Sequence, residues 1–193
     1  MSGSSGRPSA GPLQFVLLAL LFVLPLIIAT WLYYGGRALQ PGGQTNHGVI
    51  LEPIVNLRDA LPNARASALS EGHWLLIYAN EDECETSCRD ALYRLRQSRL
   101  MLGKDMSRVT RVFLHGHTAP DRVFLELEHP GLRVVEDREW SELLAEKLPE
   151  RVAADGFFLV DPLGNLVMYF APDIAPGDMV DDIEHLLDLS QIG

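Results

Sequence analysis

The chain has 193 residues, a composition typical of a folded protein (47% hydrophobic, 22% charged) and a formal net charge of −10. This length allows one ordinary domain with additional segments. The acidic balance argues against nucleic acid as a partner, because phosphate binding needs a basic face; a solvated acidic surface explains the charge, and a basic partner would also fit it.

The N-terminal part of the sequence contains one long apolar segment. No charged residue occurs between Arg7 and Arg37, and residues 12–34 are almost wholly apolar. These 23 residues exceed the roughly 20 that a helix needs to cross the hydrocarbon core of a membrane. We therefore predict a transmembrane anchor over residues 12–34 that contacts membrane lipid. The alternative is a cleaved signal peptide, whose apolar core would be shorter and would end in small residues.

The segments on either side of the predicted anchor give its orientation and the start of the domain. Arg7 and Arg37 flank the anchor on opposite sides, so the positive-inside signal is nearly balanced. The short tail of residues 1–11 is most simply left in the cytoplasm while the larger part is exported. Residues 35–47 contain Pro41 and four glycines, which is typical of a flexible tether. We expect residues 48–193 to form the exported domain.

The domain sequence alternates between strand and helix patterns. Residues 48–57 alternate loosely and favour a short leading hairpin, and the patterns after them are regular. The predicted strands are residues 73–78, 109–114, 132–135, 156–160 and 166–170, and the predicted helices are residues 88–102, 140–148 and 178–189. Residues 161–165 (DPLGN) supply the turn of a final hairpin. This order predicts an α/β fold, a thioredoxin-like three-layer sandwich preceded by the N-terminal transmembrane helix.

The chain has only two cysteines, Cys84 and Cys88, and they fall where the first buried strand gives way to the first long helix. Residues at i and i+4 share one face of a helix, so both sulfurs can converge on one atom or on each other. A helix N-terminus stabilises thiolate, which attacks disulfides and also binds a soft metal such as Cu(I). We predict Cys84 and Cys88 as a redox-active or metal-binding pair. Two alternatives stay open: a weak structural disulfide, or two ordinary buried residues.

Several of these features together resemble the Sco/SenC family of membrane-anchored, thioredoxin-like proteins. The shared features are the apolar anchor, the strand-to-helix C-x3-C of Cys84 and Cys88, and the late run of residues 157–165 (FFLVDPLGN). The resemblance implies a bacterial inner-membrane protein with a periplasmic domain that assists assembly of the cytochrome c oxidase copper centre. It implies Cu(I) as a possible ligand, and an oxidase subunit or a copper chaperone as the partner.

The sequence departs from the family pattern at one ligand position. Sco-type proteins carry a third copper ligand, a histidine just before the late strand, and the corresponding stretch around Ala153 has none. The departure shifts weight from copper carriage toward dithiol–disulfide chemistry. No proline lies just before the strand at residues 156–160, where ordinary thioredoxins place one facing the cysteines, so general oxidoreductase activity is disfavoured as well.

The pair His115 and His117 follows the second predicted strand at its C-terminal end, where sites in such sheets usually form. His-x-His can bind a metal, so His115 or His117 is a tentative extra ligand beside Cys84 and Cys88. The alternative is that both are loop histidines without a role.

Three functions are compatible with these patterns. The first is an assembly factor for the oxidase copper centre that acts through dithiol–disulfide exchange, Cu(I) carriage or both. The second is a general periplasmic thiol–disulfide oxidoreductase, which would be an enzyme. The third is a non-catalytic thioredoxin-like binding module with an inert disulfide. The fold alone does not choose among them, so whether the protein is an enzyme stays open.

Overall fold

The computed structural model describes residues 11–35, 46–60, 72–116, 118, 121–147 and 155–190. The chain separates into two compact units, Met1–Thr45 and Asn46–Gly193. The proposed tail of residues 1–11 and the tether of residues 35–47 lie almost wholly outside the described residues, so their predicted roles stay predictions.

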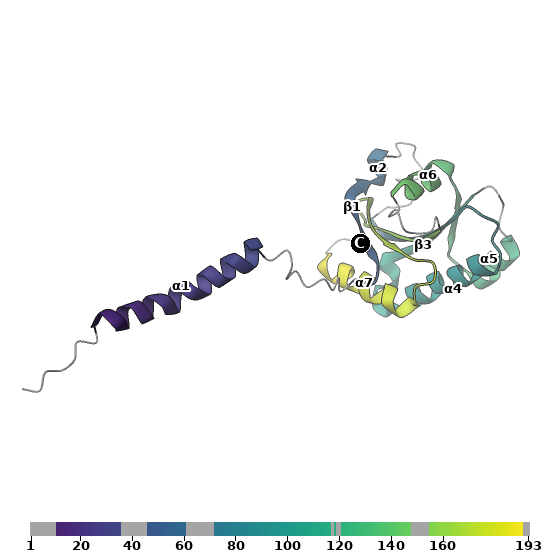
Figure 1. Ribbon diagram of the computed structural model, residues 1–193. Coiled ribbons are helices and arrows are strands. Elements are labelled where there is room, and N and C mark those ends of the chain that lie inside the picture. The colour runs from purple at the N-terminus through teal and green to yellow at the C-terminus, as the bar shows by residue number, and fades with distance from the viewer. Residues whose placement is uncertain are drawn as a thin grey trace, which may run out of the picture. The chain divides into compact units, whose positions relative to one another are not determined.

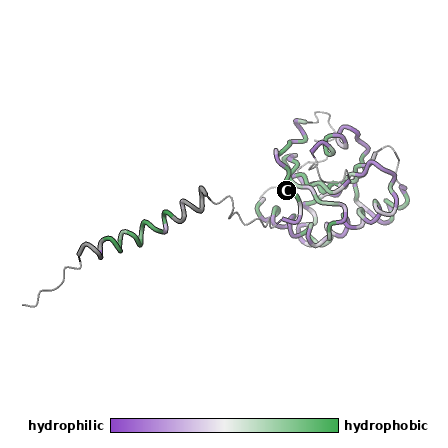
Figure 2. The backbone as a smooth tube through the Cα atoms, in the orientation of Figure 1, coloured by the Kyte–Doolittle hydropathy of each residue, from purple (hydrophilic) through white to green (hydrophobic). Residues whose placement is uncertain are grey.

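Helix α1 (Gly11–Gly35) is the described element of the first unit and has Pro25 inside it. Its middle carries apolar side chains that are largely exposed, such as Leu21 and Phe22, and Figure 2 shows this stretch coloured as hydrophobic. Within the described residues, no helix has the length and hydropathy needed to cross a membrane. The predicted anchor over residues 12–34 is therefore helical but unconfirmed as a membrane span.

A mixed sheet forms the centre of the second unit. Its described strands are β1 (Val49–Asn56), β2 (Trp74–Asn80), β3 (Val109–His115), β4 (Arg133–Glu136), β5 (Gly156–Val160) and β6 (Asn165–Phe170). They lie in the order β1-β6-β5-β2-β3-β4. Strands β2, β3 and β4 are parallel, whereas β5 and β6 form an antiparallel hairpin and β5 pairs antiparallel with β2. The C-terminal ends of the adjacent strands β2 and β3 therefore lie side by side at the same end of the sheet. The cysteines follow β2 at this end.

Helices cover both faces of this sheet (Figure 1). They are α2 (Leu57–Ala60), α4 (Thr86–Met101), the 3-10 helix η2 (Gly103–Arg108), α5 (Arg122–Glu128), α6 (Arg138–Lys147) and α7 (Pro176–Leu189). Every residue of β2 is buried, and successive side chains alternate between the two faces. Leu76 and Tyr78 pack with residues of α4 and α7, whereas Leu75 and Ile77 pack with Trp140 of α6. The predicted three-layer α/β domain is confirmed.

One local prediction was wrong, and two helical elements were not predicted. Residues 48–57 do not form a hairpin; β1 is a single strand that pairs antiparallel with β6, with a register shift between Ile50 and Val55. The strand pairs with a distant partner because β6 leaves an edge free, and the Leu57 N–H then donates to the Gly164 carbonyl (2.8 Å). Helix α5 and η2 were not predicted. The predicted hairpin of β5 and β6 is confirmed, and Asp161 Oδ1 closes its turn by accepting from the N–H groups of Leu163 (2.9 Å) and Asn165 (2.8 Å).

Candidate functional site

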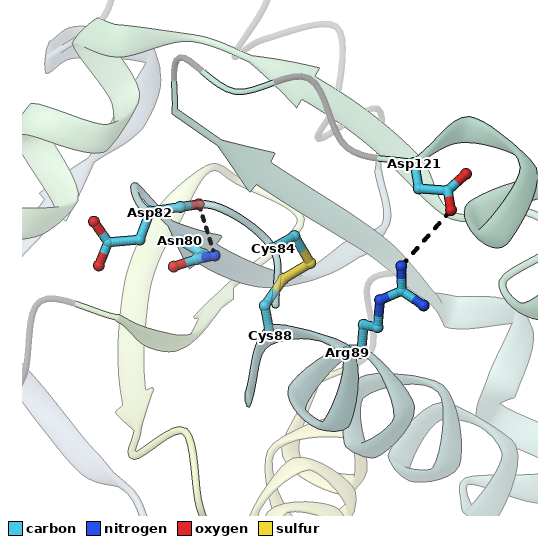
Figure 3. The surroundings of a disulfide bond; sticks show 6 residues. All are labelled: Asn80, Asp82, Cys84, Cys88, Arg89 and Asp121. Atoms are coloured by element: carbon cyan, nitrogen blue, oxygen red, sulfur yellow. Dashed lines mark hydrogen bonds and ion pairs between the residues drawn. A yellow bond between two sulfur atoms is a disulfide. The ribbon is translucent and has the colours of Figure 1, made fainter. Parts of the chain in front are cut away.

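The turn from β2 into α4 holds the two cysteines. Strand β2 ends at Asn80, α4 begins at Thr86, and Glu85 is the N-cap residue. Cys84 therefore precedes the helix and only Cys88 lies on it, which corrects the expectation that both share a helical face. The two Cα atoms are 5.0 Å apart, and the sulfurs form a disulfide (Figure 3). The bend in the chain before Glu85, and not the i, i+4 spacing of a helix, brings the two sulfurs together.

The two sulfurs differ in their access to solvent. The Cys88 side chain is 1% exposed and packs in the core beside Ala91 and Leu92, whereas Cys84 is only partly buried against the same core. Cys84 is therefore the more accessible of the two bonded cysteines to an incoming thiolate. Attack at Cys84 would release the Cys88 sulfur as the leaving group within the first turn of α4, where the helix dipole favours negative charge.

The loop that carries Cys84 is held by backbone and amide contacts. Asn80 Nδ2 donates to the Asp82 carbonyl oxygen (3.1 Å), and the Glu85 N–H donates to the Glu83 carbonyl (2.8 Å). The loop after β3 packs closely against this one: the Gly116 N–H donates to the Asn80 carbonyl (3.1 Å), and a Cβ at Gly116 would lie 2.5 Å from the Glu81 carbonyl oxygen. Gly116 therefore permits the close approach of the two loops.

Arg89, the residue after Cys88, links α4 to α5. Its guanidinium forms an ion pair with Asp121 at 3.7 Å (Figure 3). The same guanidinium lies 4.4 Å from the ring centroid of Phe124. Asp121 Oδ1 also caps α5 by accepting from the N–H groups of Val123 (3.0 Å) and Phe124 (3.2 Å). The sequence interpretation missed this cluster. The signal that could have revealed it is an aspartate at the N-cap position followed by an apolar run.

His115 lies at the C-terminal end of β3, in register with Asn80 of β2. His115 is 8% exposed, and its Nδ1 donates to the Gly116 carbonyl (2.9 Å) because that oxygen can only accept. Among the described residues, no group of three or more His, Cys, Asp or Glu is arranged to hold a metal ion. His117 and the stretch around Ala153 lie outside the described residues. The tentative role of His115 or His117 as an extra ligand stays a prediction.

Two buried tyrosines near the core keep their protons. Burial, with a further contribution from Asp155, raises the pKa of Tyr78. Burial, with contributions from Asp155 and Asp173, raises the pKa of Tyr169 to about 12. Tyr78 lies on the sheet face that packs against α4, the helix of Cys88. Neither phenol therefore adds negative charge to the domain at neutral pH.

His129, at the end of α5, is buried without a hydrogen-bond partner for either ring nitrogen among the described residues. Its ring forms T-shaped contacts with two aromatic rings. The ring centroid of Phe124 lies 5.0 Å away and that of Tyr93 lies 6.3 Å away. Burial lowers the pKa of His129, and the positive charges of Arg111 and Arg96 lower it further, partly offset by Glu128. The folded protein therefore holds this imidazole neutral beneath the helix that Asp121 caps.

This shift predicts a loss of stability in mild acid. The pKa of His129 in the folded protein lies below its value of about 6.5 in the unfolded chain. Between these two pKa values the unfolded chain binds one more proton than the folded protein, so the free energy of unfolding decreases as the pH falls through this range. One proton gives a slope of at most about 1.4 kcal/mol per pH unit. Urea unfolding of the full-length chain at pH 7.5 and 5.0 should show a smaller loss for His129→Phe than for the wild type. The exposed His185→Gln is the matched control, and equal losses in wild type and His129→Phe would contradict the prediction.

Comparison with known proteins adds a family and a fold. A family model described as transmembrane-like, thioredoxin-like, C-terminal domain matches residues 74–190. No curated protein matches the chain. Yeast Sco1 is 20% identical and aligns over 64% of this chain and 85% of that chain with a TM-score of 0.50. This likeness confirms the Sco-like thioredoxin fold expected from the sequence.

Two further solved structures align less closely. Copper-bound ScoI of Bradyrhizobium japonicum is 17% identical over 62% of this chain and 88% of that chain, with a TM-score of 0.46. A thiol:disulfide interchange protein of the thioredoxin family from Chlorobium tepidum is 11% identical over 62% of this chain and 83% of that chain, with a TM-score of 0.48.

Proposed function

Because the chain belongs to the family of transmembrane-like, thioredoxin-like C-terminal domains, we propose that Cys84 and Cys88 form a reversible dithiol–disulfide pair that assists assembly of the cytochrome c oxidase copper centre. The observation that carries the proposal is the unequal access of the two bonded sulfurs. One cysteine is partly exposed at a strand-to-helix turn, and the cysteine bonded to it is buried in the helix. This arrangement favours stepwise thiol–disulfide exchange over a purely structural disulfide. A bond that closes so short a loop also adds little stability.

The exchange proceeds in two balanced steps. In the oxidising direction, a partner thiolate attacks the Cys84 sulfur, the Cys84–Cys88 bond breaks and Cys88 leaves as thiolate. A second thiolate of the partner then attacks the partner sulfur that is bonded to Cys84, and Cys84 is released as thiolate. The partner loses two electrons and gains a disulfide, and the chain becomes a dithiol. In the reverse direction, a chain reduced by a dithiol donor reduces a partner disulfide, such as one between the copper-site cysteines of an oxidase subunit.

Cu(I) carriage is a second role for the same reduced pair. Thiolates are preferred ligands of Cu(I), which accepts low coordination, so the two sulfurs alone suit this ion as cargo. The sequence resemblance to the Sco/SenC family supports the assignment to oxidase assembly, and the likeness to yeast Sco1 supports the fold. The partner would be an oxidase subunit or a copper chaperone.

The proposed location is the bacterial inner membrane, with residues 12–34 as a single-pass anchor and the C-terminal domain in the periplasm. The apolar, exposed side chains of α1 support the anchor, and a disulfide-bonded domain suits an oxidising compartment. The tether of residues 35–47 would let the domain reach a membrane-embedded partner.

The reduction potential of the full-length chain tests the proposal. We expect equilibration with glutathione or dithiothreitol redox buffers to give a potential above about −300 mV, since structural disulfides typically lie below that value. A lower potential would leave an inert bridge in a non-catalytic module. Rapid turnover on insulin would instead favour the general oxidoreductase, because an assembly factor needs no catalytic turnover of an unrelated protein's disulfides.

A further inference from the structure

The surface around the reactive sulfur is strongly acidic. Residues 81–90 contain five carboxylates, and all five side chains are exposed. We refer to them as the acidic rim: Glu81, Asp82, Glu83, Glu85 and Asp90. The one basic residue of this segment is Arg89. The rim surrounds the disulfide in the sequence on both sides, so its field acts on whatever approaches Cys84.

Ion pairs with described neighbours do not neutralise the rim. Within the described residues, Arg89 pairs with Asp121 of α5 and lies over the Phe124 ring, and none of the five rim carboxylates forms an ion pair. The positive charge nearest to Cys88 in the sequence is thus already engaged elsewhere. The rim therefore presents to solvent carboxylates that no ion pair among the described residues compensates.

The position of the rim acts on Cys84 in particular. Glu83 and Glu85 are its immediate neighbours, and consecutive Cα atoms lie about 3.8 Å apart, well inside the roughly 8–10 Å screening length of physiological salt. Asp82 turns its carboxylate away from the sulfur pair in Figure 3, so it contributes through the field and not through contact. Charges of one sign around a reactive group raise the encounter rate with oppositely charged partners.

We propose that the acidic rim makes the Cys84–Cys88 pair selective for partners whose reacting cysteines are flanked by positive charge. The rim residues are specificity-determining and do not themselves react; the sulfurs remain the site. The inference rests on the proposed dithiol–disulfide function and adds the class of partner to it, a basic protein surface carrying thiols or a disulfide. Acidic partners are repelled at the same distance.

Small disulfides of different charge measure this selectivity directly. The full-length chain in neutral detergent is reduced with dithiothreitol, freed of it, and mixed with cystamine (positive), bis(2-hydroxyethyl) disulfide (neutral) or 3,3′-dithiodipropionate (negative). The Cys84 thiolate attacks one probe sulfur and releases half of the probe as thiolate. Cys88 then attacks Cys84 and releases the other half, so the probe gains two electrons and the chain regains its disulfide. Each rate constant is divided by that of 2-mercaptoethanol with the same probe.

We expect the normalised cystamine rate to exceed the dithiodipropionate rate by about tenfold or more at low ionic strength, the lower end of electrostatic steering. The ratio should fall toward one at about 1 M salt, where screening is nearly complete. The double variant Glu83→Gln, Glu85→Gln should lower it several-fold. Dividing each charged-probe rate constant by the rate constant for the neutral probe removes any general change in thiol reactivity.

The matched control removes the same charge from the other end of the domain. Glu184→Gln with Asp188→Asn changes two exposed carboxylates of α7, whose last residue, Leu189, lines a cavity with Trp74 at the start of β2. This variant should keep the wild-type ratio. Normal exchange with the neutral probe but a ratio near one at low salt would overturn the inference alone. Absence of exchange even with the neutral probe would overturn the proposed function, and this inference with it.

Discussion

A Cys84→Ser variant is expected to lose exchange with a neutral disulfide by at least about 10³-fold, as for removal of a nucleophile, whereas Cys88→Ser is expected to stop at a mixed disulfide. The reason is the difference in burial: Cys88 is 1% exposed, and Cys84 is partly exposed at the turn before α4. The remaining thiol of Cys84→Ser is shielded from a probe, while the remaining thiol of Cys88→Ser can react but has no second sulfur to resolve the product.

Mass spectrometry of the reduced variants after incubation with bis(2-hydroxyethyl) disulfide gives the measurement. Cys88→Ser should retain one half of the probe, and Cys84→Ser should remain unmodified over the same time. Ser87→Ala, which removes an exposed hydroxyl between the cysteines, should keep the wild-type rate and serves as the control. Adducts that form equally fast on both serine variants would show that burial does not set the attacking cysteine.

The sequence predicted this region well because its signals are local. The continuous apolar run of β2, the polar turn and the helical spacing after Cys88 lie within thirty residues, and each follows from side-chain periodicity. The predicted helix began at residue 88, two residues after the start of α4 at Thr86, and only the expectation that both cysteines share a helical face was wrong. Helix boundaries depend on backbone geometry at the cap, here at Glu85, and C-x3-C spacing alone fits a helix equally well.

The features that the sequence did not reveal depend on contacts between distant residues. Strand β1 pairs with β6 more than a hundred positions later, and nothing in residues 48–57 distinguishes that pairing from a local hairpin. The stacking of Arg89 on Phe124 needs α5 to pack beside α4. The burial of His129 likewise arises from the meeting of α5 with Tyr93 of α4, so its lowered pKa has no signature in the sequence.

Reduced chain is expected to bind one Cu(I), and either Cys84→Ser or Cys88→Ser is expected to weaken that binding by more than the roughly 10–100-fold that loss of an outer-shell partner costs. Two thiolates are the minimum ligand set for Cu(I), so neither sulfur can be replaced by the other. His115→Ala is expected to leave the affinity unchanged, because the ring is nearly buried, Nδ1 is bonded to the Gly116 carbonyl, and the described residues hold no group of three ligands.

Anaerobic titration of the full-length chain against a competing Cu(I) chelator distinguishes the outcomes. A weaker affinity in His115→Ala would make that histidine a ligand. Unchanged affinity in the double variant His115→Ala, His117→Ala would remove both histidines from the site. Failure of the reduced wild type to compete with the chelator would exclude copper carriage and leave dithiol–disulfide exchange as the chemistry of Cys84 and Cys88, because that reaction needs only the reversible bond between the two sulfurs.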